Sequence, residues 1–164
     1  RVDQADPDRW LQMYKMNVLS ALELTNRCLP LIRKNGGGSL VFLTSTAAHG
    51  TYPGGGGYVA AKHAEAQIAA TLRLELVGEP IRVIEIAPGL VATEEFSLNR
   101  LGSKEASDKV YEGVDNPLVA EDVAEGIRWT LDAPPHMNVD LMVLRPVAQC
   151  SNTQVHRAPL KVRD

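Results

Sequence analysis

Residues 80–89 read PIRVIEIAPG, and this stretch indicates the fold class of the whole chain. Between its two prolines it carries mostly apolar side chains on both faces of an extended backbone. A strand of this kind is covered on both sides, as in a parallel sheet sandwiched between helices. The Pro88-Gly89 pair ends the apolar run. We therefore expect a buried parallel strand over Ile81–Ile86.

Two further apolar runs predict strands on either side of it in the sequence. SLVFLTS at 39–45 is also apolar on both faces, and VDLMVLRP at 139–146 has a similar character. The expected strands are Ser39–Leu43 and Leu141–Arg145. Short runs of this length, rich in Val, Leu and Phe, are typical of buried strands.

Helical patterns occupy the intervening segments. An alanine-rich helix is expected from Tyr58 to Val77, and AEDVAEGIRWTL at 120–131 reads as an amphipathic helix. The order is thus helix, strand, helix, strand, loop, helix, strand. This alternation favours an α/β fold with a parallel sheet and right-handed crossovers.

An N-terminal helix is expected from Asp6 to about Lys34. Asp6 can cap the helix, Pro7 suits its first position, and the glycines from Gly36 onward stop it. The polar Asn17 interrupts its apolar face. The candidate buried residues are Trp10, Met13, Leu24, Cys28 and Leu31.

The chain reads as one domain, residues 1–164, but as part of a larger architecture. Three strands make a narrow sheet with at least one open edge. No Gly-rich loop joins a first strand to a first helix, and no acidic residue follows at the spacing that dinucleotide-binding folds use. We therefore interpret the chain as the C-terminal part of a doubly wound, Rossmann-type domain.

Composition excludes several functional classes. A net charge of −3 gives no basic footprint for nucleic acid or for an anionic membrane. No apolar run approaches the ~18 residues of a membrane span. Cys28 and Cys150 are far apart, which favours reduced thiols in a cytoplasmic protein. The four histidines lack metal-ligand spacing, so we expect no metal site.

Candidate functional groups cluster where the strands end. Ser45 follows the first strand, YVAAK at 58–62 opens the next helix, and PGLVAT at 88–93 follows the second strand. Ligands bind beyond the carboxyl ends of parallel strands. Tyr58 and Lys62 are four residues apart, so they project from one helix face. An ammonium about 4 Å from a phenol could lower its pKa by up to about three units, into the range of a general acid/base.

Each of these features alone has a simpler structural explanation. Ser45 can merely end a strand, Pro88-Gly89 is a common turn, and Tyr58 can begin an ordinary helix. Asn17 can be a polar helix residue without further role. The combination is more specific, because thirteen positions separate Ser45 from Tyr58 and a strand ending in PGLVAT follows the Tyr-Lys pair.

The chain resembles the short-chain dehydrogenase/reductase family from about residue 6 to its end, without the family's N-terminal nucleotide-binding half. The matching motifs are MNVLSALELT, LTSTAAHG, YVAAK and APGLVAT. Within that family it is most similar to bacterial NADP-dependent 3-hydroxy-acid dehydrogenases that oxidise serine and allo-threonine. YPGGGGYVAAK, EIAPGLVATEEF and the tail VDLMVLRPVAQ…VHR carry the narrower resemblance.

The resemblance implies roles for individual residues. Tyr58 would be the acid/base, Lys62 would lower its pKa and bind the nicotinamide ribose, and Ser45 would hold the substrate oxygen. Asn17 would anchor a water that links Lys62 to solvent. The residues implied to line the nicotinamide and diphosphate side, in addition to Tyr58 and Lys62, are Pro88, Gly89, Val91 and Thr93.

The resemblance also implies an activity. The chain would transfer a hydride between NADP(H) and a small alcohol or carbonyl compound, with a 3-hydroxy acid as the narrower candidate. NAD remains an alternative, because the residues that choose between the two cofactors lie in the half that is absent here. A second alternative is a non-catalytic or truncated relative that serves as an assembly or ligand-sensing module.

Two expectations concern assembly and access. Members of the family are usually tetramers, so the helix from Asp6 and the helix from Tyr58 are expected to pair with those of other subunits in a homotetramer or dimer. The polar stretch from Glu94 to Val114 has few apolar anchors and is expected to be a mobile substrate lid.

Overall fold

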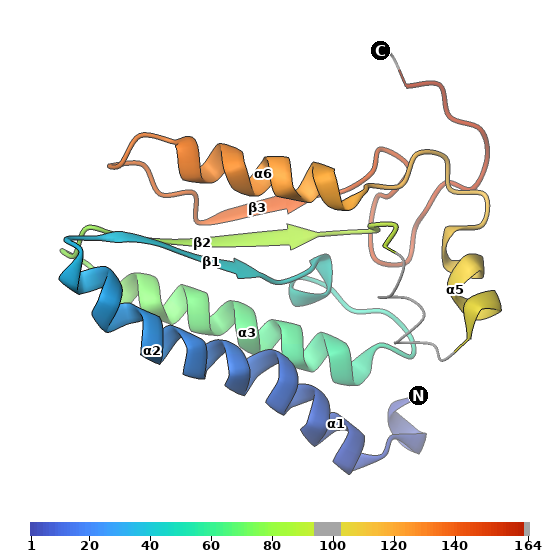
Figure 1. The fold of residues 1–164 in the computed structure, drawn as a ribbon. Coiled ribbons are helices and arrows are strands. Elements are labelled where there is room, and N and C mark those ends of the chain that lie inside the picture. Colours follow the sequence, from blue (N-terminus) through green and yellow to red (C-terminus); the bar gives the residue numbers. More distant parts are fainter. Residues whose placement is uncertain (94–102, 163–164) are drawn as a thin grey trace.

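A computed structural model describes residues 1–93 and 103–162 and shows a three-stranded sheet between two layers of helices (Figure 1). The strands are β1 (Gly38–Leu43), β2 (Ile81–Pro88) and β3 (Leu141–Leu144). They are parallel, in the order β1-β2-β3. All three expected strands and the predicted parallel α/β architecture are therefore confirmed.

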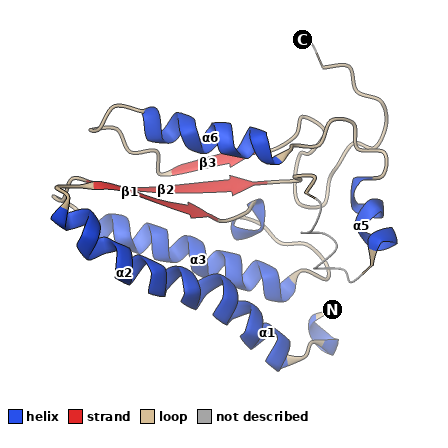
Figure 2. Ribbon diagram, in the orientation of Figure 1, coloured by secondary structure: helices blue, strands red, loops and turns tan. Residues whose placement is uncertain are grey.

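The helices divide between the two faces of the sheet (Figure 2). One face carries α1 (Pro7–Tyr14), α2 (Ser20–Lys34) and α3 (Gly56–Glu75), and the other carries α6 (Ala120–Asp132). The short helix α5 (Lys104–Tyr111) lies beyond the carboxyl ends of the strands. Within the described residues, no helix is long and apolar enough to cross a membrane.

Strand β2 is apolar on both faces because each face has its own helical layer. Val83 packs with residues of β1 and α3, whereas Ile84 and Ile86 pack with Val123 of α6. These three β2 side chains are at most 1% exposed. Burying each one stabilises the fold by roughly 1.5–3 kcal/mol relative to leaving it in water. Glu85 shares the α3-facing side with Val83, since alternate residues of a strand point the same way.

The predicted N-terminal helix is not continuous. Asp6 caps α1 as expected, with its side chain accepting the Asp8 N–H at 2.9 Å. A π-helical turn over Lys15–Leu19, called η2, then separates α1 from α2. The Asn17 side chain lies in this turn and donates to the Met13 carbonyl at 2.9 Å. Single π turns inside helices commonly occur at functional sites.

The prediction that Leu24 and Leu31 are buried is wrong. Their exposed fractions are 64% and 62%, whereas Trp10, Met13 and Cys28 are partly buried. Helix α2 instead turns another stripe inward, at Ala21, Thr25 and Leu29. The two stripes have the same helical period, so periodicity does not distinguish the one that faces the core of this chain.

The expected lid lies partly outside the described residues, which omit 94–102. Its described part contains α5, and the expected lid role stays a prediction. Val114 is 9% exposed, and the Tyr111 hydroxyl donates to the Val91 carbonyl at 2.8 Å. This hydrogen bond ties the C-terminal end of α5 to the segment that follows β2.

Candidate active site

A cavity of about 640 Å³ opens at the carboxyl ends of β1 and β2. All eight residues selected from the sequence line it, although they come from η2, α3 and the ends of two strands. They are Asn17, Ser45, Tyr58, Lys62, Pro88, Gly89, Val91 and Thr93. The parallel sheet brings them together because its strands end at one edge.

Ser45 lies in extended conformation where β1 ends and caps the short 3-10 turn η3 (Thr46–Ala48). Its hydroxyl oxygen accepts the Ala47 N–H at 3.1 Å. The hydroxyl also donates to the Pro88 carbonyl, but at 3.4 Å. A donor–acceptor distance this long indicates a weak bond, so the proton can be redirected to a ligand oxygen at little cost.

The first turn of α3 places Tyr58 and Lys62 on one face, as predicted. The Lys62 Nζ lies 5.9 Å from the centroid of the Tyr58 ring. The glycine run before them has a packing role, because the missing side chains leave room for two aromatic rings. A Cβ at Gly55 would lie 2.2 Å from the Tyr52 ring, and a Cβ at Gly57 would lie 3.1 Å from Trp10 Nε1.

Lys62 is 9% exposed, and its ammonium is held by two protein acceptors. It donates to the Leu43 carbonyl at 3.1 Å and to Glu65 Oε2 at 2.7 Å. Glu65 is itself 7% exposed. Sequence reasoning did not assign Glu65 to the site. The signal that could have identified it is a Glu three residues after Lys62 on a helix face that is otherwise apolar.

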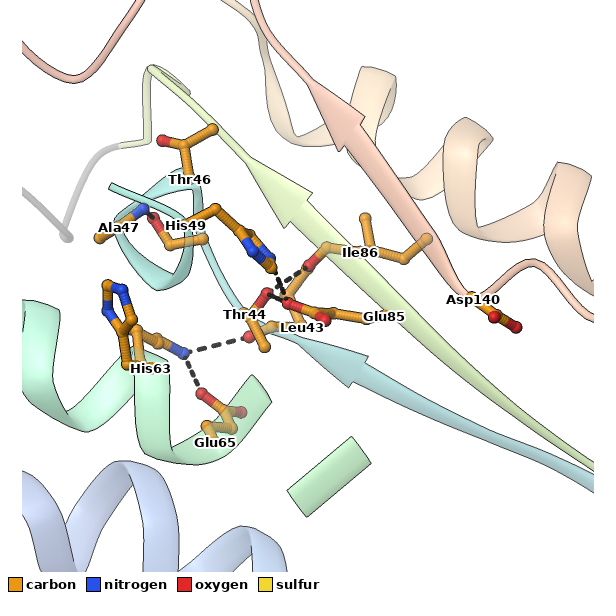
Figure 3. Close-up of polar contacts among 12 residues, drawn as sticks. Leu43, Thr44, Thr46, Ala47, His49, His63, Glu65, Glu85, Ile86 and Asp140 are labelled. Carbon is orange, nitrogen blue, oxygen red and sulfur yellow. Dashed lines mark hydrogen bonds and ion pairs between the residues drawn. The ribbon is translucent and has the colours of Figure 1, made fainter. Parts of the chain in front are cut away.

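A second buried carboxylate lies behind this pair on β2. Glu85 is 4% exposed, and its Oε1 accepts the Thr44 hydroxyl at 2.6 Å. The same oxygen lies 2.8 Å from His49 Nε2. Figure 3 shows Glu85, Thr44 and His49 grouped on the α3 side of the sheet, near Glu65.

The C-terminal tail supplies a wall of the cavity that sequence reasoning did not assign to the site. Gln149, Asn152, Val155 and Arg157 all line it. Gln149 Oε1 accepts the Leu90 N–H at 2.8 Å and would be 2.2 Å from a Cβ at position 89. A Cβ at position 89 would therefore displace the end of the Gln149 side chain from its hydrogen bond with Leu90. Local pattern offers no signal for this wall, because the tail reaches the cavity only through the fold.

The cavity combines groups suited to proton transfer on a ligand oxygen. A serine hydroxyl, a phenol and a buried ammonium face one space, and no carboxylate from the described part of the chain lines it. A phenol beside an ammonium can exchange a proton near neutral pH. The described residues also contain no group of three or more His, Cys, Asp or Glu that could hold a metal ion.

Comparison with known families identifies the class. The model of the short chain dehydrogenase family matches residues 1–102, more than half of the chain. The chain therefore belongs to this family.

Individual proteins of known sequence are similar to most of the chain. Over 98% of its length the chain is 45% identical to an uncharacterized oxidoreductase of Mycobacterium tuberculosis and covers 63% of that protein. Over 90% of its length it is 38% identical to serine 3-dehydrogenase of Agrobacterium fabrum and covers 59% of that protein.

A solved structure is similar to nearly the whole chain. The closed form of a serine dehydrogenase complexed with NADP+ superimposes with a TM-score of 0.86 and 30% identity, covering 99% of this chain and 63% of the other. The chain thus spans about three-fifths of the length of these proteins.

Proposed function

We propose that the full-length protein is an oxidoreductase that transfers a hydride between NADP(H) and a small 3-hydroxy acid. The observation that carries the proposal is the convergence of Asn17, Ser45, Tyr58 and Lys62 on one cavity, at the family's spacing. In oxidation, the phenolate of Tyr58 takes the proton of the substrate hydroxyl while Ser45 donates a hydrogen bond to the same oxygen. Asn17 would anchor the water that links Lys62 to solvent.

The residues present fit a nicotinamide cofactor. Lys62 and Tyr58 offer donors to ribose hydroxyls, Pro88 and Val91 give an apolar wall for a flat ring, and Gly89 and Thr93 lie beside them. The bound cofactor would supply the acceptor for the hydride of the substrate carbon. NADP is favoured over NAD by the similarity to the serine dehydrogenase complexed with NADP+.

The acid group of the substrate is proposed on electrostatic grounds. Serine, the substrate that the Agrobacterium relative's name gives, is itself a 3-hydroxy acid. Among the described residues, the cations that line the cavity are Lys62 and Arg157. Lys62 already holds Glu65, so we assign the substrate carboxylate to Arg157. The Arg157 guanidinium also donates to the Val110 and Glu112 carbonyls, which places it against the C-terminal end of α5.

Arg157→Gln is expected to raise the KM for 3-hydroxy acids by about 10- to 100-fold, because a hydrogen bond to a charged group contributes ~1.5–3 kcal/mol. The KM for neutral alcohols of similar size should change little. Steady-state kinetics on matched acid and alcohol pairs give both values. Arg128→Gln is the control, since Arg128 lies on the exposed face of α6 with Glu125 and Asp132. An equal rise in KM for the acids and the neutral alcohols would mean that Arg157 only anchors α5 and does not bind the substrate carboxylate.

The activity itself is tested with purified full-length protein. Reduction of NADP+ and NAD+ is followed by absorbance over serine, allo-threonine, other 3-hydroxy acids and neutral secondary alcohols. Turnover with the acids and NADP+ is the expected result. Absence of turnover on every substrate, with cofactor still bound, would favour a non-catalytic assembly or ligand-sensing relative.

The proposal includes a cytoplasmic homotetramer or dimer. Free thiols at Cys28 and Cys150 suit a reducing compartment. The exposed apolar stripe on α2, at Leu24 and Leu31, suits a subunit interface, because monomers rarely leave such a stripe in water.

Replacing both leucines of this stripe with Glu is expected to lower the mass of the assembly. Light scattering of the unsubstituted full-length protein should give a multiple of its chain mass. The double variant Leu24→Glu with Leu31→Glu should give a smaller mass. Leu131→Glu, on the exposed side of α6, is the matched control because it lies on the opposite face of the sheet. A parent mass equal to one chain would refute the oligomer.

A further inference from the structure

Glu65 is a buried carboxylate beside the proposed acid/base pair for which the mechanism above has no use. It lies on α3, seven residues after Tyr58 and three after Lys62, so the three side chains share one helix face. Glu65 and Lys62 form an ion pair of 2.7 Å with side chains only 9% and 11% exposed. An exposed pair of this spacing would contribute little to stability. In a buried pair, removing one partner leaves the other as an uncompensated buried charge.

The charged form of the buried Glu65 carboxyl depends on Lys62 for its stabilisation. Burial raises the pKa of the Glu65 carboxyl, the Lys62 ammonium opposes that rise, and the charge of Glu85 on β2 adds to it. His49 faces Glu85 rather than Glu65, and the His63 ring on α3 bonds to the Val59 carbonyl. The one cation with a hydrogen bond to the Glu65 carboxylate, among the described residues, is therefore the ammonium that faces Tyr58.

We propose that Glu65 is a positioning residue: it fixes the Lys62 ammonium beside Tyr58 and offsets part of the positive charge that reaches the phenol. The Leu43 carbonyl is the second anchor of the same ammonium. With both anchors on the protein, the position of Nζ does not depend on a bound ligand. The catalytic meaning of this arrangement rests on the proposed function, whereas the electrostatic effect on Tyr58 does not.

The magnitude of the offset follows from the helix geometry. Seven residues at a rise of about 1.5 Å place Glu65 roughly 10 Å from Tyr58 along the axis. A unit charge at ~10 Å and an effective dielectric near 20 shifts a pKa by about one unit. Lys62 is closer, so its effect prevails. The sign is nevertheless clear, since removing a negative charge stabilises the phenolate and lowers the pKa of Tyr58.

Glu65→Gln tests the proposal, because it keeps the shape and one hydrogen-bond acceptor and removes the charge. The pKa of Tyr58 is read without turnover, from the ultraviolet absorbance of tyrosinate in full-length protein. Each variant is titrated against the same variant carrying Tyr58→Phe, so that only Tyr58 contributes to the difference. The midpoint is expected to fall by about one pH unit in Glu65→Gln.

Glu75→Gln is the matched control on the same helix, at an exposed position, and should leave the midpoint unchanged. Glu65→Met also removes the charge, and the Leu43 carbonyl still anchors the ammonium, so the midpoint should fall in the same direction. This variant replaces Glu65→Gln if that one does not fold. A midpoint that is unchanged or higher in the folded charge-removing variant would overturn the proposal. A parallel fall in the midpoint of the pH–rate profile supports it further.

These two readouts separate the inference from the proposed function. If no substrate is turned over, the proposed function fails, but the tyrosinate titration still decides the role of Glu65. If turnover is found and the midpoint does not move, the function stands and the proposal for Glu65 fails. A purely structural role for Glu65 would lower thermal stability without moving the Tyr58 midpoint.

Discussion

Tyr58→Phe in the full-length protein is expected to lower turnover by a factor on the order of 10² or more. The substitution keeps the ring, which is partly buried at the start of α3, and removes only the hydroxyl. The fold should therefore persist because the ring is kept, and the binding of NADPH should persist because Lys62 still donates to the ribose. Steady-state kinetics give the loss of turnover, and NADPH fluorescence gives the binding constant.

Tyr111→Phe is the matched control for this prediction. Tyr111 lines the same cavity, but its hydroxyl donates to the Val91 carbonyl. Its loss should affect substrate affinity through α5 rather than proton transfer. Near-normal turnover of Tyr58→Phe on the best substrate would mean that YVAAK is only the beginning of a helix.

Lys62→Ala is expected to have a broader effect. Turnover should fall together with cofactor affinity, since the ammonium serves both the phenol and the ribose. The pH–rate profile of the remaining activity should move to higher pH, because the phenol loses the neighbouring positive charge and its pKa rises. Stability should also fall by about 3–5 kcal/mol, because the Glu65 carboxylate is left buried without its ammonium.

A double variant distinguishes the catalytic loss from the structural one. Lys62→Met with Glu65→Leu removes both charges of the buried pair and should recover much of the stability, since apolar replacements of buried pairs are well tolerated. It should recover no turnover. Thermal melting and steady-state kinetics on the single and double variants give the comparison. Recovery of turnover along with stability would show that Lys62 has only a structural role.

The sequence by itself determined the sheet. Strands β1, β2 and β3 lie where the apolar runs predict them, since a strand covered by helices on both faces must be apolar on both faces. It also determined where the candidate site would form. Ser45, Tyr58 and the segment from Pro88 to Thr93 occupy the carboxyl ends of parallel strands in any fold with this order of elements.

The tertiary structure alone decided the features that depend on partners distant in sequence. The π turn around Asn17, the exposure of Leu24 and Leu31, and the approach of Gln149 to Gly89 have no local pattern that predicts them. Periodicity reports which residues share a face, but not which face the rest of the chain covers. Glu65 is the clearest case: its helix position was readable from the sequence, but only packing buried it against Lys62 and made it an ion pair.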